Sequence, residues 1–240
     1  MKRAMLVRRP FSPFQAMLRS LPGVILLGIL VLPLAGCGEP VPIQPPRPTV
    51  IVITAEGPFY ATFDEAGDWL LGDSDRSSGH IEDGVYVLNI KEPSLVAWTN
   101  QTRAFGDGVY SAEVALQYGP EASAFGLLLL GSSDLKSFVY VMITADGRYD
   151  IGTCENSCRR QQSLVDGFTL AYAIVSGIGS VNHIDVALSN GSLRLSVNGT
   201  PVGQVSGLRY SEGLVGLVGE SSPYGGFAAT FDNVHVEEAP

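Results

Sequence analysis

From residue 51 onward, pairs of turn-forming residues recur along the chain. The pairs are Asp83–Gly84, Asp107–Gly108, Asp146–Gly147, Asn190–Gly191 and Asn198–Gly199. Asn or Asp followed by Gly supplies the positive φ angles that tight β-hairpins need. A chain that is punctuated in this way is predicted to fold into short antiparallel strands.

The residues between these turns alternate between apolar and polar side chains. The alternation has a period of two in segments 110–116, 183–188 and 192–197. In the second segment, for example, Ile184 and Val186 share one face. This period is typical of strands that bury one face. The last strand is predicted over Phe227 to Val236, with the Phe231 ring pointing into the core, as the Leu195 and Val197 side chains do.

Two other runs, 125–130 and 138–144, are apolar on both faces. They are predicted to be central strands, because neither face of them suits water. Only segment 168–176 is ambiguous between helix and strand, and there is no convincing amphipathic helix. About a dozen short strands favour an all-β fold, an antiparallel sandwich of two sheets.

The first 36 residues are predicted to be a signal peptide that exports the chain. Residues 1–20 contain five basic residues and no acidic one, and an apolar run follows over 21–35. This run is shorter than the roughly 20 residues of a membrane-spanning helix. It ends in the string Leu34-Ala35-Gly36-Cys37, which resembles the bacterial lipobox. Cys37 is therefore expected to carry lipid and anchor the mature chain to the cell membrane or envelope. A plain secreted precursor is the alternative.

The sequence divides into three parts: the signal peptide (1–36), a linker (37–50) and one domain (51–240). Five prolines over 38–50 indicate an extended, semi-rigid spacer after the lipidated cysteine. The true start could be Met1, Met5 or Met17, and Arg8-Arg9 leaves a twin-arginine signal open.

The mature chain is strongly acidic. The 36-residue leader holds five of the 15 basic residues and none of the 24 acidic ones, so the rest has a net charge of −14. Such a surface repels nucleic acid, other polyanions and anionic lipid head groups. Neutral sugars, cations and basic partners remain as candidates, and the partner expected is a neutral glycan or another envelope protein.

Two cysteines remain besides Cys37. Cys154 and Cys158 lie four residues apart, and a close pair with no other partner is expected to be oxidised outside the cytoplasm. They are predicted to form a disulfide. A zinc site is disfavoured, because two thiols without a neighbouring His or Cys cluster cannot complete one.

No catalytic motif is visible. The sequence contains no Glu-x-Asp-x-x-Glu strand of the kind that glucanases carry, no Gly-x-Ser-x-Gly elbow, no Walker loop and no His-Glu-x-x-His. The three histidines, His80, His183 and His235, are scattered, and each is interpreted as a solvated or hydrogen-bonded imidazole. The chain is therefore expected not to be an enzyme and to require no cofactor.

An ordered set of short strings over residues 57–238 resembles concanavalin A-like lectin and glucanase jelly rolls, especially the laminin-G-like domains of bacterial surface lipoproteins. The strings are Phe63-Asp64 with Gly67-Asp68-Trp69, 83–86, 125–127, 138–140 with 146–149, 182–186, 193–199, 213–217 and 231–234. The resemblance implies two stacked antiparallel sheets, one of them concave, with the two termini on adjacent strands. It does not fix a function, because such domains include sugar binders, adhesion modules and glycosidases.

A sugar site needs an exposed aromatic ring beside polar groups. Four residues are candidates: Trp69, Trp98, Tyr210 and Tyr224. Both tryptophans are more typical of core packing, although Trp69 stays a speculative ligand-binding residue. Tyr224 is the best single candidate, because it lies among Ser, Pro and Gly residues.

A structural calcium ion is the other ligand to consider. Asp64 and Asp232 belong to the first and last strands, which the jelly-roll resemblance places side by side, and Asp73 and Asp75 follow nearby. Calcium prefers several such oxygens. Solvated surface acids are the simpler interpretation.

The function expected from these observations is a non-catalytic, lipid-anchored recognition domain for neutral glycan. An adhesion or structural module is the second hypothesis, and an atypical glycosidase a remote third. Exposed aromatic rings on the concave sheet would favour glycan, and a large exposed apolar patch would favour protein. Carboxylate pairs about 5 to 9.5 Å apart in a cleft would favour the enzyme.

Overall fold

The computed structural model describes residues 57–64, 67, 69 and 71–239. The signal peptide, Cys37 and the linker lie outside the described residues. Within the described part every regular element is a β-strand, so the all-β prediction is confirmed. The ambiguous segment 168–176 contains only the two-residue strand β11. None of the described residues forms a helix that is long and apolar enough to cross a bilayer.

The strands follow one another along the chain in this order: β1 (Phe59–Ala61), β2 (Gly72–Asp73), β3 (Ser77–Glu82), β4 (Val85–Ile90), β5 (Val96–Phe105), β6 (Gly108–Tyr118), β7 (Ala124–Gly131), β8 (Phe138–Thr144), β9 (Arg148–Glu155), β10 (Arg160–Ser163), β11 (Thr169–Leu170), β12 (Asn182–Ser189), β13 (Ser192–Val197), β14 (Thr200–Ser206), β15 (Gly213–Glu220) and β16 (Phe227–Glu238).

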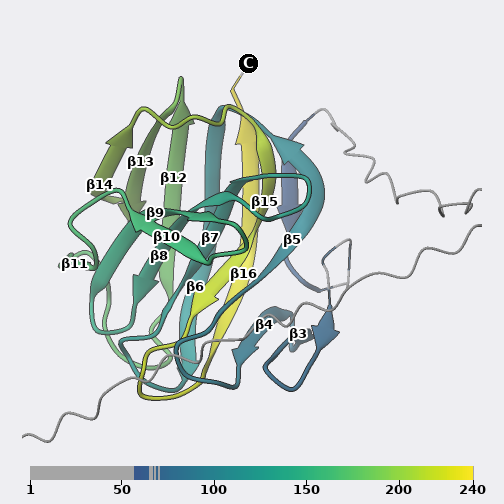
Figure 1. The fold of residues 1–240 in the computed structure, drawn as a ribbon, viewed down its shortest axis with the longest axis vertical. Helices are drawn as coiled ribbons and strands as arrows, with labels where there is room; N and C mark the ends of the chain where they lie inside the picture. Colours follow the sequence, from purple (N-terminus) through teal and green to yellow (C-terminus); the bar gives the residue numbers. More distant parts are fainter. Residues whose placement is uncertain (1–56, 65–66, 68, 70, 240) are drawn as a thin grey trace, which may run out of the picture. The chain divides into compact units, whose positions relative to one another are not determined.

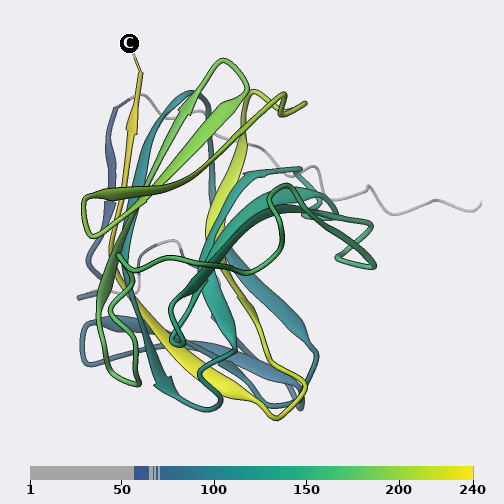
Figure 2. The ribbon, with the colours of Figure 1, turned by 90° about the vertical axis from the view of Figure 1, so that its left-hand side faces the viewer.

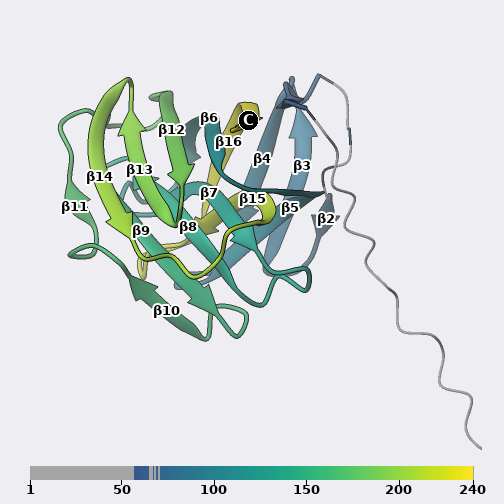
Figure 3. The ribbon, with the colours of Figure 1, turned by 90° about the horizontal axis from the view of Figure 1, so that it is seen from above.

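These strands form two antiparallel sheets (Figure 1). The nine-stranded sheet has the order β14-β13-β12-β6-β16-β4-β3-β2, with β1 also paired to β16. The seven-stranded sheet has the order β10-β9-β8-β7-β15-β5, with β11 also paired to β9. Figure 2 shows the two sheets as separate layers, and Figure 3 shows the strand order of each from above. The predicted two-sheet jelly-roll sandwich is confirmed.

The main core lies between the sheets, where the alternating apolar side chains meet. Phe231 of β16 and both Leu195 and Val197 of β13 are fully buried there, as the period-two pattern predicts. Strands β7 and β8 are buried along their whole length on both faces, which confirms them as central strands. Each hydrophobic side chain of this size contributes on the order of 1.5–3 kcal/mol when it is buried.

Four of the five predicted turn pairs do close hairpins. At Asp83–Gly84, Asn190–Gly191 and Asn198–Gly199 both residues have positive φ, and at Asp146–Gly147 the glycine does. The fifth prediction is wrong. Asp107–Gly108 joins β5 of one sheet to β6 of the other, because Asp-Gly can also turn the chain across a sandwich.

The first and last strands pair with each other, so the chain enters and leaves at one end of the sandwich. Gly57 accepts a hydrogen bond from the Arg103 side chain at 3.1 Å, and the Ala239 N–H donates to the Asp107 carbonyl at 2.8 Å. We call this end the tether end. The opposite end, the far end, carries the loops that follow β6, β8, β11 and β15.

Phe231→Ala tests the register of the core. Truncation of this fully buried ring is expected to lower the free energy of unfolding by about 3–5 kcal/mol. Urea denaturation measures the loss. The matched control is Tyr224→Ala, because that ring is 87% exposed and should change stability by no more than about 0.5 kcal/mol. Equal effects of the two variants would show that the register is wrong.

Candidate functional site

The seven-stranded sheet curls so strongly that its outer face becomes a closed trough. Gln161 of β10 donates from Nε2 to Oε2 of Glu220 in β15 at 2.7 Å. Strands β9, β8 and β7 separate these two strands within the sheet. Four strand spacings would measure about 19 Å in a flat sheet, which is more than the two side chains can span. The sheet therefore bends toward its outer face, and the hydrogen bond closes the trough.

Apolar side chains fill this trough and form a second core. Seven of them are buried to 1% exposure or less: Ala124, Leu128, Phe138, Tyr140, Met142, Cys154 and Val218. Half-buried Trp98 and Phe168 pack against them. The Trp98 and Phe138 rings lie 5.3 Å apart, although β15 and β7 separate their strands. Both rings therefore lean across the sheet toward each other.

The polar groups inside the trough bind one another. The Tyr140 hydroxyl donates to Asp150 Oδ2 at 2.9 Å, and the Ser163 hydroxyl donates to Asp150 Oδ1 at 2.6 Å. Asp150 is only 3% exposed, so these two hydroxyls replace the water that its carboxylate loses. Burial, and then the charge of Asp150, raises the pKa of Tyr140. The trough presents no free platform for a sugar.

Both tryptophans are less exposed than the two candidate tyrosines. Trp69 is 5% exposed and packs in the main core, with ring centroids 5.3 Å from Phe63 and 6.1 Å from Tyr86. This burial corrects the ligand-binding role considered for Trp69, because stacking requires an open ring face. Trp98 lies at the border of the trough, where its ring contacts Phe138.

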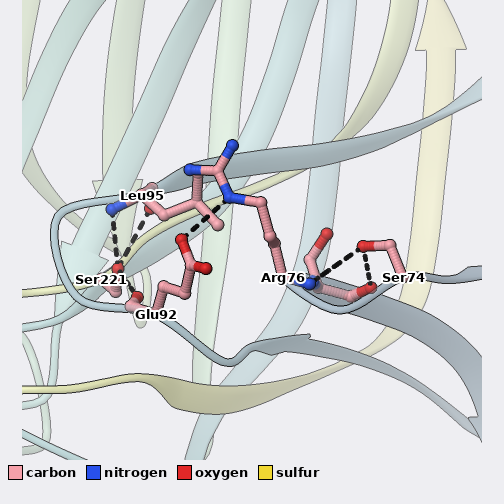
Figure 4. A network of polar contacts seen from close by, with 6 residues as sticks. Ser74, Arg76, Glu92, Leu95 and Ser221 are labelled. Atoms are coloured by element: carbon pink, nitrogen blue, oxygen red, sulfur yellow. Dashed lines mark hydrogen bonds and ion pairs between the residues drawn. The ribbon is translucent and has the colours of Figure 1, made fainter.

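Tyr224 is exposed on a loop that begins at Ser221. Figure 4 shows the polar contacts of Ser221 with Glu92 and Leu95. Buried Ser221 donates its hydroxyl to the Glu92 carbonyl at 2.6 Å and accepts from the Leu95 N–H at 2.9 Å. The Arg76 guanidinium in turn contacts the Glu92 carboxylate at 2.8 Å. These contacts hold the start of the loop that carries Tyr224 at the far end. Tyr224 itself lines none of the hollows described below.

Three of the candidate aromatic residues border a hollow. Trp98 lines one of about 280 Å³ and Trp69 one of about 470 Å³, but Tyr210 is the most exposed of the three. Two adjoining hollows, of about 270 Å³ and about 460 Å³, share Leu208, Arg209 and Tyr210. The smaller one opens between the edge strands β10 and β14 and is lined further by Val139, Thr153, Glu155, Gln162, Leu164, Ser206 and Gly207. The larger one continues over the tether end along Asp107, Asn190, Gly191 and Ser211. We call both together the Tyr210 groove.

The groove has the composition of a sugar site. The Tyr210 ring is 38% exposed, and aliphatic Leu208 lies beside it. Amide, carboxylate, guanidinium and hydroxyl groups surround them, from Gln162, Glu155, Arg209 and Thr153. An aromatic face with several hydrogen-bonding groups around it can bind one pyranose ring. The sequence offered Tyr210 as a candidate but could not show that strands β9 and β10 supply polar partners, Thr153 and Glu155 from β9 and Gln162 from β10.

Of the acidic residues considered for calcium, Asp64 and Asp232 lie near each other. Strand β1 ends at Ala61, so Asp64 follows the first strand and the prediction that it belongs to that strand is wrong. Asp232 lies directly opposite Glu113 of β6, and Asp64 lies close enough to act on its charge. Burial raises the pKa of Asp232; the Asn233 N–H opposes this rise, and the Glu113 and Asp64 carboxylates add to it. The hollow beside Glu113 and Asp232 measures about 100 Å³, below the range of about 300 Å³ and more that holds ordinary ligands.

Asp73 and the histidines contact neighbouring side chains, although the buried Nε2 of His235 has no hydrogen-bond partner. Asp73 forms an ion pair with Lys91 at 2.7 Å, and the Lys91 contact lowers its pKa. His183 lies 3.1 Å from Asp185, and His235 stacks on Tyr60 with centroids 4.2 Å apart. Among the residues that the structure describes, no group of three or more His, Cys, Asp or Glu side chains could hold a metal ion.

The predicted disulfide between Cys154 and Cys158 is present, with Cα atoms 4.6 Å apart. It closes the turn between β9 and β10, in which Asn156, Ser157 and Cys158 all have φ between 52° and 56°. Three successive non-glycine residues in this left-handed region are unfavourable without a constraint. The disulfide holds this turn, and with it the start of strand β10, which carries Gln161 over the trough.

The fold is similar to that of known carbohydrate-active and galectin-like sandwiches. A carbohydrate-binding module, CBM66, from Bacillus subtilis aligns with a TM-score of 0.58 at 13% identity, over 71% of this chain and 96% of that one. A Bacillus subtilis protein of unknown function with a galectin-like fold gives 0.54 at 12% identity, over 75% and 94%. A Bacillus licheniformis β-glucanase gives 0.52 at 13% identity, over 78% and 100%. At 12–13% identity, these proteins are similar to this chain in fold.

No protein-family model matches the sequence, and no curated protein matches it.

Replacement of both cysteines of the disulfide by Ser tests its role as a local staple. Because the closed loop is small, the loss in the free energy of unfolding is expected to be about 1–2 kcal/mol. Urea denaturation of the oxidised wild type and the double variant measures it. Mass spectrometry of the non-reduced wild type should find Cys154 and Cys158 in one linked peptide, and two freely alkylated thiols would refute the pairing.

Proposed function

We propose that this chain is a lipid-anchored, non-catalytic recognition domain that binds a neutral glycan in the Tyr210 groove. The observation that carries the proposal is the half-exposed Tyr210 ring at the junction of two polar-lined hollows. The trough is filled, the small hollow beside Glu113 and Asp232 cannot take a sugar ring, and Trp69 is buried. Among the candidate aromatic residues that border a hollow, Tyr210 is the most exposed, and this favours its groove as the place for stacking.

Charge and fold support the same proposal. The net charge of −14 on the mature chain disfavours polyanionic ligands and leaves neutral sugars as suitable ones. The proteins of similar fold include a carbohydrate-binding module and a β-glucanase, as their names say. The absence of a recognised catalytic motif from the sequence favours binding over hydrolysis.

Tyr210→Ala tests the groove. Loss of one stacking ring is expected to weaken sugar binding about 5- to 30-fold, by analogy with base stacking on aromatic side chains. Isothermal titration calorimetry with a panel of neutral oligosaccharides at millimolar concentration measures it. Tyr210→Phe, which keeps the ring, should bind nearly as the wild type does.

Tyr224→Ala distinguishes the groove from the loop at the far end. We expect it to leave the affinity unchanged. If Tyr224→Ala weakens binding and Tyr210→Ala does not, the site lies at the far end instead. If no sugar in the panel releases heat, the adhesion module becomes the better hypothesis.

Cys37→Ser tests the anchor. The variant is expected to leave the membrane fraction and to lose labelling by a fatty-acid probe, because Cys37 is the acylated residue of the lipobox-like string. Fractionation of expressing bacteria, followed by immunoblotting, measures both forms. Membrane retention of an unlabelled wild type would contradict lipidation.

A further inference from the structure

The segment between residues 170 and 181 is an uncharged, apolar protrusion at the far end. It contains no Asp, Glu, Lys, Arg or His. Five of its side chains are more than half exposed: Leu170 51%, Tyr172 94%, Val175 55%, Ile178 55% and Val181 59%. So many exposed apolar side chains in one short segment mark an interaction surface in a water-soluble domain.

Hydrogen bonds hold this segment in one shape. The Gly177 N–H donates to the Ala145 carbonyl at 2.8 Å, and the Gly179 N–H donates to the Leu116 carbonyl at 2.7 Å. Both glycines have positive φ, so the chain turns at each of them and presents Ile178 between the two contacts.

Buried side chains hold the first half of the segment. Ala171 and Ile174 belong to the main core, at 8% and 5% exposure. The Asn182 side chain bonds to both the N–H and the carbonyl of Val175, at 2.8 and 3.0 Å. Tyr172 and Val175 therefore point outward from a fixed backbone, and binding would order little that is not ordered already.

The surroundings of the segment are acidic. Asp146 lies between Ala145 and Gly147, whose carbonyls accept hydrogen bonds from the Gly177 and Ala171 N–H groups. The Asp146 N–H donates to the Glu121 carbonyl. Exposed Asp166 precedes the segment by four residues. Arg148 pairs with Leu170 and lies 3.6 Å from the Asp146 carboxylate. At the other end of the segment, Val181 lines a hollow together with Glu113 and Asp232. With Asp146 paired to Arg148, these two carboxylates give the border a negative balance.

This charge distribution favours one kind of binding partner for segment 170–181. A second copy of the chain would bring its own carboxylates against those at the border of the segment, and an anionic bilayer would repel the same carboxylates. A protein with an apolar pocket bordered by Lys or Arg complements both the protrusion and its border. Segment 170–181 also lies at the far end, away from the tether end where Gly57 enters the fold.

We propose that segment 170–181 is a docking surface for a partner protein whose apolar pocket is bordered by basic side chains. Tyr172 and Ile178 are the anchors that enter this pocket, because exposed aromatic and aliphatic tips on a rigid backbone provide most of the binding free energy at such contacts. This surface is separate from the Tyr210 groove and does not depend on it.

Panning a random 12-residue peptide phage library on the purified mature protein tests the proposal. Peptides that combine apolar side chains with Lys or Arg should be enriched. Their affinity, measured by fluorescence anisotropy, should fall at least tenfold for both Tyr172→Ser and Ile178→Ser, and should also fall with added salt. Tyr224→Ser is the matched control, since it removes an equally exposed ring at the same end, and it should bind the peptides as the wild type does.

Other results would overturn the proposal. These are the absence of enriched peptides, enrichment of acidic peptides, or equal binding by the Tyr172 and Ile178 variants. Flotation of the wild type, but not of these variants, with phosphatidylcholine vesicles would assign the surface to a bilayer. A dimer in sedimentation equilibrium that both variants abolish would assign it to a second copy. Sugar binding by the variants should be unaffected, which separates this test from that of the groove.

Discussion

Strands β7 and β8 carry apolar side chains on both faces, and neither face can be left in water. The nine-stranded sheet covers only the inner face. The outer face is covered by the seven-stranded sheet itself, which curls until Glu220 on β15 meets Gln161 on β10. Nearly every residue of both strands is thereby removed from solvent, and each buried CH₂ group is worth about 0.8 kcal/mol. The sandwich thus has two cores, one between its sheets and one inside the trough.

This second core decides where recognition can take place. Since Phe138, Tyr140 and Met142 fill the trough, the broad face of the sheet is not open to ligands. The accessible surfaces lie where the sheet edges separate and where loops leave the strands. The Tyr210 groove lies between separated sheet edges, by the tether end. Segment 170–181 is a loop at the far end. Because the two proposed surfaces lie at opposite ends, both can bind a partner at the same time.

Much of the fold follows from local patterns in the sequence. Period-two alternation placed Phe231 and Leu195 in the core, and the apolar runs marked β7 and β8 as central. Four of the Asn/Asp-Gly pairs are hairpins because their positive φ angles are a local property of the backbone. Asp107–Gly108 failed as a hairpin, because a tight turn does not reveal whether the next strand joins the same sheet or the other one.

The sites were less predictable, because they depend on contacts between distant residues. Gln161 and Glu220 are 59 residues apart, and nothing local to either indicates that the other is near. The loop composition around Tyr224 correctly predicted exposure, but an exposed ring without a hollow beside it is a weaker sugar site than Tyr210. The uncharged stretch around Tyr172 is visible in the sequence. Its outward display is not, because hydrogen bonds from Gly177, Gly179 and Asn182 produce it.

The curled, filled trough is the central claim, and nuclear Overhauser effects between assigned aromatic protons test it most directly. The ring centroids of Trp98 and Phe138 lie 5.3 Å apart, so strong cross-peaks should join their ring protons in the oxidised protein. In a flat sheet the three strand spacings between β5 and β8 would hold their backbones about 14 Å apart or more. Absence of these cross-peaks, with the Trp98 indole freely quenched by acrylamide, would show an open face and contradict the account.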